Sequence, residues 1–516
     1  MKTENRNNGP QLDRWSFLWL VVATVLVIFS IGLQRIPLAA WLAPIFLIRF
    51  MRSRSTGRGY LWILLSLTIS NWIAWGDLFT ISSIFTPLLT KAIFVPVFAL
   101  LYSIPYLINR LLARRLPGFA ATLVFPLAAT AFDFLFTFVD PMGSFGLWAN
   151  ALHNSPVLMQ LLSITGIHGL TFLMGWFAST SVWVWEQAFS WPKIWRGLAI
   201  YGTFLVLVMV YGSIRLSFFH PQPGTVRVHQ IIEAVDWPND RMMTELPPLL
   251  ATDPETFERI TTGMHQKYIE DTIQEARAGA QIVVWPEVAG LADEKGTAAL
   301  LARGKEVARQ EGIYLGLPTF TVYPDPATPV DNRLFIIDPA GKIVLEHEKY
   351  GCTAFNLSQI KLTAFDTPYG RMSGVLCCDL DFPTVISQAG RKAVDILFVP
   401  SNEPLASIVQ MHVQQAPFRV IENGFSLVRP TYGGVSLYTD PYGRVLAMID
   451  QRLASSKVLV VQVPTHRVVT VYSVIGDLFG WLTIAGFVII TGWAIFRERK
   501  TSVEATTSPE SQAPSA

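Results

Sequence analysis

The chain has 516 residues, of which 51% are hydrophobic and only 15% are charged, and this composition is too apolar for a wholly soluble protein. Forty basic residues against 38 acidic ones leave a net charge of +2, which gives no argument for a nucleic-acid partner. The apolar excess lies before Ser217 and after Tyr472, whereas the segment between Thr225 and Pro464 has ordinary globular composition. We therefore expect a membrane protein that carries one soluble domain.

Apolar runs form the first part of the chain, and most of them approach the roughly 20 residues that a helix needs to cross a bilayer. They cover residues 15–33, 38–50, 60–79, 85–107, 119–139, 157–185, 198–214 and, after the soluble domain, 475–496. No small-residue cleavage site follows the first run, so we expect a retained span rather than a signal peptide. The sequence predicts a seven-span membrane domain at residues 15–216 and a last transmembrane helix at 472–497.

The connections between these runs alternate in charge. Basic residues precede the first run, fill the even-numbered connections and follow the last run: Lys2, Arg6, Arg14, Arg49, Arg52, Arg54, Arg58, Arg110, Arg114, Arg115, Lys193, Arg196, Arg497, Arg499 and Lys500. The positive-inside rule then predicts a cytoplasmic N-terminus (1–14), a disordered cytoplasmic tail (501–516) and an extracytoplasmic soluble domain. In a bacterium this places the protein in the inner membrane, with the soluble domain facing the periplasm.

A few polar residues interrupt the apolar runs. Asp77, Asp133 and Asp140 lie in or near predicted spans, where an ionisable residue often marks function, but each can sit close to the interfacial region and we expect no catalytic role. The stretch 143–173 is more polar than a lipid-facing helix. It either lines a cavity or packs against another helix.

Strand and helix patterns alternate in the soluble domain, residues 222–466. Strands are predicted at 226–230, 281–285, 313–320, 332–339, 342–347, 395–399, 426–430, 434–438, 445–448 and 457–463, and helices at 254–276, 297–310, 383–390 and 408–423. A further apolar strand begins at Gly370 and leads to Cys377. This alternation predicts an α/β sandwich with helices outside the sheets and catalytic residues at strand ends. Both connections to the membrane part are short, so the domain stays close to the bilayer.

Three residues at strand ends suggest one site. A cysteine thiol has a pKa of about 8.5 and reacts as thiolate, so Cys377 needs a base. Glu287, behind a buried strand, is a candidate for that base, or else a solvated loop residue or helix N-cap partner. Lys349 is either a cation that lowers the thiol pKa and stabilises an oxyanion, or an exposed strand end. Cys377 itself could be a small buried hydrophobe.

The surrounding motifs resemble those of a known superfamily. They are Trp285-Pro286-Glu287, Glu348-Lys349-Tyr350 and Leu376-Cys377-Cys378-Asp379, which are similar to the Glu-Lys-Cys series of the nitrilase superfamily. With seven spans before this domain and one after it, the chain to about Arg499 resembles the apolipoprotein N-acyltransferase family. The resemblance implies a multi-span α-helical membrane domain plus an extracytoplasmic α/β nitrilase-like domain, an α-β-β-α sandwich, without a cofactor.

The resemblance also implies a two-step acyl transfer. Glu287 would take the thiol proton, Cys377 would attack a phospholipid acyl ester, and Lys349 would hold the oxyanion. The resulting thioester would acylate the N-terminal amine of a diacylated prolipoprotein. The expected partners are therefore a phospholipid donor and this lipoprotein acceptor, with the protein integral to the membrane and no nucleic acid.

Further residues are assigned with the resemblance. Cys377 is preferred to Cys378 because the family's acidic residue, here Asp379, stands two positions after the nucleophile, and because strand neighbours point to opposite faces. Asn402, Glu422 and Trp237 are expected to support the site or line the lipid route. For Glu422 a solvated helix position, and for Trp237 an ordinary core role, are the alternatives.

The sequence also departs from the family. Residues 350–357 contain no carboxylate where the family has a supporting glutamate, and Cys378 replaces an aromatic residue. Whether Cys352 and Cys378 form a disulfide is left open. Two other functions also stay open: a membrane-tethered amidase that uses water as acceptor, and a divergent homologue with weakened catalysis and a binding role.

Overall fold

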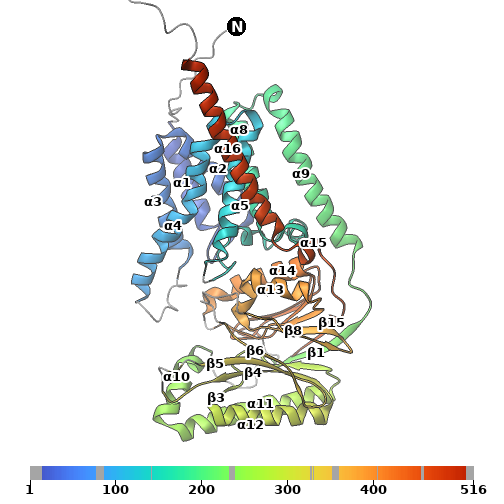
Figure 1. Ribbon diagram of the computed structural model, residues 1–516. Coiled ribbons are helices and arrows are strands. Elements are labelled where there is room, and N and C mark those ends of the chain that lie inside the picture. The colour runs from blue at the N-terminus through green and yellow to red at the C-terminus, as the bar shows by residue number, and fades with distance from the viewer. Residues whose placement is uncertain are drawn as a thin grey trace, which may run out of the picture.

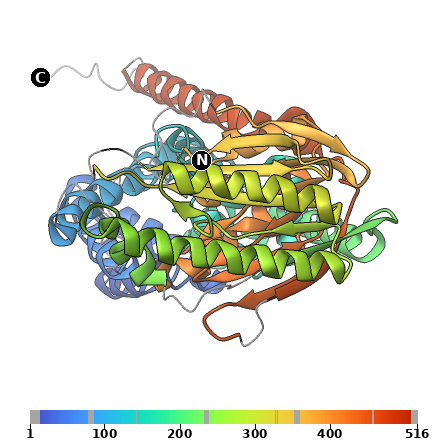
Figure 2. The same cartoon turned by 90° about the horizontal axis from the view of Figure 1, so that it is seen from below.

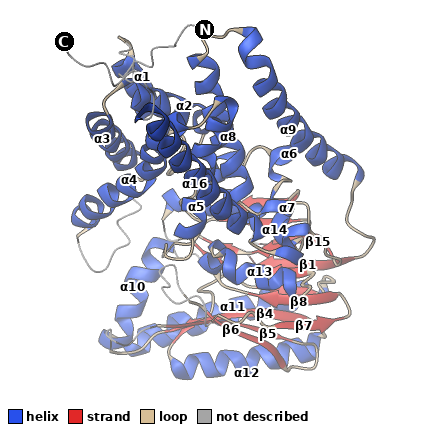
Figure 3. Ribbon diagram, turned by 45° about the horizontal axis from the view of Figure 1, so that its top comes forward, coloured by secondary structure: helices blue, strands red, loops and turns tan. Residues whose placement is uncertain are grey.

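The structure is a computed structural model that describes residues 14–76, 86–140, 142–231, 239–325, 328, 330–350, 360–403, 405–454 and 458–506. Asp77, Trp237 and Cys352 lie outside these residues, as does almost all of the loop that follows Lys349. A helical bundle stands on a two-sheet domain, and the end of the last helix, α16, points away from that domain (Figure 1). Strands gather at one end of the molecule only (Figure 3).

Two twisted sheets form the middle of the soluble domain. The first has the order β15 (Val458–Pro464), β1 (Thr225–Ile231), β2 (Ile282–Val284), β4 (Tyr314–Thr321), β5 (Asp331–Ile337) and β6 (Ile343–Glu348), with β3 (Leu291–Ala292) on β4. The second has the order β14 (Val445–Asp450), β13 (Val435–Thr439), β11 (Ser426–Arg429), β9 (Ile396–Phe398), β8 (Gly370–Gly374) and β7 (Ala364–Thr367). Apolar side chains of both sheets meet between them, including Val228, Ile282, Leu334, Ile396 and Val428.

Helices cover the outer faces of both sheets. The helices α11 (Pro254–Arg277) and α12 (Glu294–Glu311) lie across the first sheet, as the view from below shows (Figure 2). The helices α13 (Pro383–Arg391) and α14 (Ala406–Asn423) lie on the second sheet, between it and the bundle (Figure 1). A further helix, α10 (Asn239–Thr252), contacts α11. The predicted α-β-β-α sandwich is confirmed, because each sheet has one apolar face toward the other sheet and one toward helices.

The bundle contains a helix at every predicted apolar run. Its long helices are α1 (Ser16–Ile28), α2 (Pro37–Ser53), α3 (Thr56–Ala74), α4 (Pro87–Leu112), α5 (Val124–Phe136), α8 (His168–Glu186), α9 (Trp191–Phe218) and α16 (Leu478–Thr506). In the described part of the chain, four helical stretches are long and apolar enough to cross a membrane, and a bent pair would make a fifth. The count of eight spans stays a prediction. Helix α16 continues through residues 501–506, where the sequence predicted disorder.

The run 157–185, which the sequence predicted as one span, does not form one continuous helix. It forms two short helices, α6 (Pro156–Met159) and α7 (Leu162–Thr165), followed by α8, with a bend of 118°. The cause is Gly166, which has a φ of 65° and lies against the ring of Tyr472, where a Cβ would come within 2.6 Å of the ring. A residue with a side chain would be strained and would clash at this point.

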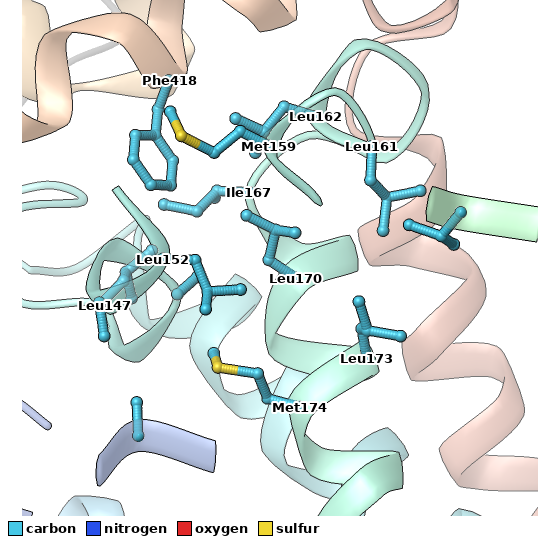
Figure 4. Close-up of a cluster of buried hydrophobic side chains, with 14 of the residues drawn as sticks. Leu147, Leu152, Met159, Leu161, Leu162, Ile167, Leu170, Leu173, Met174 and Phe418 are labelled. Atoms are coloured by element: carbon cyan, nitrogen blue, oxygen red, sulfur yellow. The ribbon is translucent and has the colours of Figure 1, made fainter. Parts of the chain in front are cut away.

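The polar stretch 143–173 packs against helices of both the bundle and the soluble domain. Figure 4 shows Met159, Leu162 and Ile167 gathered around Phe418, which comes from α14. Polar contacts accompany this packing, since Asn150 donates to Gln415 (2.9 Å). The packing interpretation is therefore confirmed, with partners on helices of the bundle and on α14 of the soluble domain. The same stretch also contributes to two small cavities in the bundle through Phe145, Gly146 and Trp148.

Two acidic residues of the bundle have structural partners. Asp133 is buried in α5 and accepts a hydrogen bond from Thr171 of α8 (2.9 Å). Asp140 accepts one from the backbone N–H of Met142 (2.9 Å) and so caps the turn after α5. Each carboxylate thus has a local structural partner, and its lack of a catalytic role stays a prediction.

The basic connections meet at one end of the bundle. Arg52 pairs with Glu186 (2.7 Å), and Arg114 donates to the backbone carbonyl of Arg52 (2.9 Å). Arg115 pairs with Glu498 near the end of α16 (2.8 Å). The soluble domain contacts the opposite end, which is the arrangement that the alternation of charge predicted. Which side of the membrane each end faces stays a prediction.

Candidate active site

Glu287 follows β2 and is enclosed by polar partners. Its Oε1 accepts hydrogen bonds from Asn332 Nδ2 (2.7 Å) and Lys349 Nζ (2.6 Å). The side chain is 2% exposed, and its Oε2 has no hydrogen-bond partner among the described residues. The alternative of a solvated loop residue is therefore wrong. A buried carboxylate with one occupied and one open oxygen has the arrangement that a general base requires.

The backbone beside Glu287 is strained. Val288 has a φ of 64°, and such a value is rare for a β-branched residue. Strained positions of this kind persist where the surrounding structure fixes them, and they cluster at functional sites. Here the backbone conformation of Val288 turns the chain away from the sheet directly after Glu287.

Lys349 is held at the end of β6 beside the same carboxylate. Its backbone N–H donates to the carbonyl of Asn332 (2.9 Å), so Asn332 fixes both Lys349 and Glu287. Burial lowers the pKa of the Lys349 ammonium, but Glu287 and Cys377 raise it more, and the net pKa lies above the ordinary value. The ion pair with Glu287 thus favours the charged form of Lys349, and because its side chain is only 16% exposed, the alternative of an exposed strand end is wrong.

Cys377 does not lie in the strand that leads to it. The strand β8 ends at Gly374, and Cys377 begins a short 3-10 helix, η6 (Cys377–Asp381), with a φ of 46°. The prediction that strand alternation separates Cys377 from Cys378 was therefore wrong, because the chain turns before it reaches them. The oxidation state distinguishes the two cysteines instead, because Cys378 is disulfide-bonded, whereas Cys377 is a free, buried thiol.

Two backbone carbonyls hold Cys377. Its N–H donates to the carbonyl of Pro400 (2.9 Å), and its thiol donates to the carbonyl of Asn402 (3.6 Å). Burial raises the pKa of the Cys377 thiol above its ordinary value, and the carboxylate of Glu287 raises it further, while Lys349 opposes the shift. The resting thiol is therefore protonated, and a reaction at this sulfur begins with removal of its proton.

Asp379 ties the turn of Cys377 to the strand end of Lys349. One carboxylate oxygen faces His347 Nε2 (2.8 Å) and accepts the N–H of Leu376 (3.2 Å). The other oxygen accepts the N–H of Tyr350 (3.3 Å). Asp379 thus lies where the sequence predicted a supporting residue.

The remaining predicted site residues lie in different places. Asn402, in β10 (Ser401–Asn402), contacts Cys377 through its carbonyl, as above. Glu422 lies on α14 in the contact with the bundle, paired with Arg419 (2.9 Å) and close to the backbone of Ile167. It is 1% exposed, so the solvated alternative is wrong, and its partners among the described residues are Arg419, Asp477 and the backbone of Ile167 rather than the three central side chains. Trp237 lies outside the described residues.

Several residues of the site were not predicted from the sequence. They are Asn332, His347, Asp381, Glu403, His412 and Arg429. His347 had a usable signal, since it lies two residues before Lys349 on the same strand and therefore on the same face. The others are brought together by segments distant in sequence, and no local pattern marks them.

Two family models match the chain, each over one of its parts. The model of the apolipoprotein N-acyltransferase N-terminal domain matches residues 23–180, in the bundle, and that of carbon-nitrogen hydrolase matches residues 261–471. Among curated proteins, the apolipoprotein N-acyltransferase of Geobacter metallireducens is 22% identical over 66% of this chain and 68% of that protein. The apolipoprotein N-acyltransferase of Rhodopseudomonas palustris is 26% identical over 66% of each.

Amidases are also similar to this chain, over a smaller share of it. The deaminated glutathione amidase of Dictyostelium discoideum is 27% identical over 37% of this chain and 69% of that protein. An amidase structure from Nesterenkonia sp. has a TM-score of 0.37 at 17% identity and covers 48% of this chain and 95% of that one. The two acyltransferases each match 66% of this chain, which is more than the soluble domain alone accounts for. The chain therefore belongs to the apolipoprotein N-acyltransferase family, within the nitrilase superfamily.

Proposed function

We propose that this chain transfers a fatty acyl chain from a membrane phospholipid, through a thioester on Cys377, to the N-terminal amine of a diacylglyceryl-cysteine lipoprotein. The observation that carries the proposal is the convergence of Glu287, Lys349 and Cys377 in one buried site beside the bundle. Family membership supports the acyl transfer, and the geometry supports the roles proposed below.

In the first step Cys377 becomes acylated. The open Oε2 of Glu287 accepts the thiol proton, and the thiolate attacks the carbonyl carbon of the phospholipid ester. Lys349 stabilises the negative charge that develops on the carbonyl oxygen. When this intermediate collapses, the C–O bond breaks, Glu287 returns the proton to the leaving alcohol, and lysophospholipid departs.

In the second step the thioester acylates the amine. The neutral α-amine attacks the thioester carbonyl, Glu287 takes the proton that the nitrogen loses, and Lys349 again stabilises the oxyanion. The C–S bond breaks, and the proton on Glu287 restores the thiol. A thioester suits this step because it reacts with amines more readily than the oxygen ester from which it formed.

The placement of the site supports a lipid substrate. The turn that follows Cys377 contacts the bundle, since Ser144 donates two hydrogen bonds to the carbonyl of Asp381 (2.8 Å each). A water-consuming amidase has no need of this contact with a membrane domain. A purely binding role would not require the buried ion pair beside a free thiol. We also propose that the soluble domain faces the periplasm from the inner membrane, because the basic connections gather at the opposite end of the bundle.

Intact-protein mass spectrometry tests the proposal. The purified protein, incubated with phospholipid vesicles, should gain the mass of one acyl chain, and peptide mapping should place it on Cys377. Addition of a diacylated lipopeptide should discharge the adduct and yield triacylated peptide, whereas water alone should leave it intact. An adduct that persists in Cys377→Ala would refute the thioester, and rapid hydrolysis without triacylated product would favour the amidase.

A further inference from the structure

His412 lies on α14 with a carboxylate at each ring nitrogen. Nδ1 is 2.9 Å from Oε1 and 2.8 Å from Oε2 of Glu403, and Nε2 is 3.2 Å from Oδ2 of Asp381. A neutral imidazole has one N–H and one lone pair, so only the doubly protonated ring can satisfy both carboxylates. Burial lowers the pKa of His412, but Glu403 and Asp381 outweigh it and raise that pKa to about 10.

These two carboxylates belong to the two segments that hold Cys377. Asp381 is the last residue of η6, the turn that Cys377 begins. Glu403 directly follows Asn402, whose carbonyl accepts the hydrogen bond of the Cys377 thiol. The backbone N–H of Glu403 donates to the carbonyl of Tyr432 (3.0 Å). The imidazolium of His412 thus bridges η6, the turn that carries Cys377, to the segment of Asn402 and Glu403, which accepts the hydrogen bond of the Cys377 thiol.

The bundle contacts the same bridge. The ring of Phe145 packs edge-on against the imidazole with centroids 5.0 Å apart, and Ser144 donates to the carbonyl of Asp381. Gly143 approaches that carbonyl so closely that a Cβ would lie 2.5 Å from it. Asn150 donates to Gln415, less than one helical turn after His412 (2.9 Å). A displacement of residues 143–150 would therefore move Asp381, at one end of the bridge, and α14, which carries the His412 ring.

The charges around the bridge determine what its loss would do. His412 faces Glu403 and Asp381; Arg429 also pairs with Glu403, and Arg35 of the bundle faces Asp381. The charged groups that act on Cys377 are Glu287, Lys349, Glu403 and Arg429. Without the imidazolium, Glu403 stays ionised beside Arg429, and the surroundings of the thiol become more negative.

We propose that His412 is a positioning residue, which links the docking of bundle residues 143–150 to the placement of the Cys377 sulfur. The inference deepens the proposed function and rests on it, since the placed sulfur is the proposed acyl carrier. In this arrangement the bundle is part of the catalytic machinery: it holds the turn on which the nucleophile is presented. Substrate contact is not assigned to His412, because its ring nitrogens are both occupied.

The test uses His412→Gln in the full-length protein with two readouts. The first is the rate of Cys377 alkylation by iodoacetamide as a function of pH, which should shift to higher pH by about one unit because the negative charge of Glu403 is no longer balanced by the His412 cation. The second is formation of the acyl-enzyme from phospholipid, which should slow about tenfold to a hundredfold with little change in KM, because the sulfur is misplaced.

His229→Gln is the matched control. His229 is also buried and paired with a carboxylate, Glu275 (2.6 Å), but these residues lie on β1 and α11 in the first sheet's layer. This variant should leave the alkylation profile and the acylation rate of the folded protein unchanged. An unshifted profile in His412→Gln, or an equal shift in His229→Gln, overturns the proposal.

A second variant covers the case in which His412→Gln does not fold. Ser144→Ala removes one hydrogen bond to the carbonyl of Asp381 and leaves the His412 ring in place. It should slow acyl-enzyme formation about threefold to tenfold, and an unchanged rate overturns the link to the bundle. Alkylation does not require acyl transfer. If the wild-type protein alkylates but forms no acyl-enzyme, the proposed function fails, while the alkylation comparison still decides the role of His412.

Discussion

Replacement of Glu287 by glutamine should change two properties of Cys377 in opposite directions. The substitution keeps the size of the side chain and its contact with Asn332, but it removes the proposed base and its negative charge. Loss of a general base slows reactions about 10²- to 10⁴-fold, so acyl-enzyme formation should fall by that factor. The same carboxylate raises the pKa of the Cys377 thiol, while Lys349 lowers it. In the variant Lys349 acts unopposed by Glu287, and the thiolate becomes more abundant.

The expected gain in thiolate is measurable. A nearby charge shifts a pKa by about one to three units, so alkylation by iodoacetamide at pH 7 should become at least about tenfold faster in Glu287→Gln. Lys349→Met is the matched variant, in which the alkylation rate should change in the opposite direction. Loss of the cation should slow both alkylation and acyl transfer. If alkylation of Glu287→Gln is unchanged or slower, Glu287 does not govern the thiol in the way that the geometry indicates.

The remaining predictions concern positioning and stability. Asp379→Asn should lower kcat for acyl transfer about tenfold with little change in KM, because the side chain loses its charge opposite His347; an effect on KM alone would contradict a positioning role. Gly166→Ala should destabilise the protein by roughly 1 to 3 kcal/mol in thermal unfolding, because Gly166 has a φ of 65° and lies against a ring, whereas Gly202→Ala, with open space around it, should not; equal effects would contradict the argument. Burial raises the pKa of Glu422 to about 7 from 4.5, so the folded state keeps a proton that the unfolded chain releases. Stability from this group is therefore full below pH 4.5 and declines by roughly 3 kcal/mol as the pH rises to 7; Glu422→Gln should remove this decline in thermal midpoints measured at pH 5 and pH 8, and an identical pH dependence in both proteins would contradict it.

The regular elements of the soluble domain could be predicted because their apolar periodicity is local. The hairpin of β5 and β6 and the helices α11 and α14 lie close to their predicted positions. Glu287 and Lys349 could be found because each follows a strand, and strand ends meet at one edge of a sheet. In these cases the signal and the structure depend on the same few consecutive residues.

The turns and the contacts between distant segments could not be predicted in the same way. The 3-10 turn at Cys377 depends on the carbonyls of Pro400 and Asn402, which lie more than twenty residues further along the chain. The break at Gly166 depends on Tyr472 of α15, which follows the whole soluble domain in the sequence. The contacts of His412 with Asp381 and Glu403 also could not be predicted, because nothing in the sequence near these three residues distinguishes them from ordinary polar residues.

The close approach of Gly143 to Asp381 also limits how such chains can be recombined. Gly143 has a φ of 60°, and any Cβ there would fall within van der Waals distance of the Asp381 carbonyl and the Phe382 ring. A chimera that joins this sandwich to a homologous bundle with a larger residue at that position would have to open the contact beside the nucleophile. Chimeras between homologues should therefore take the bundle segment around Gly143 and the turn η6 from the same parent protein.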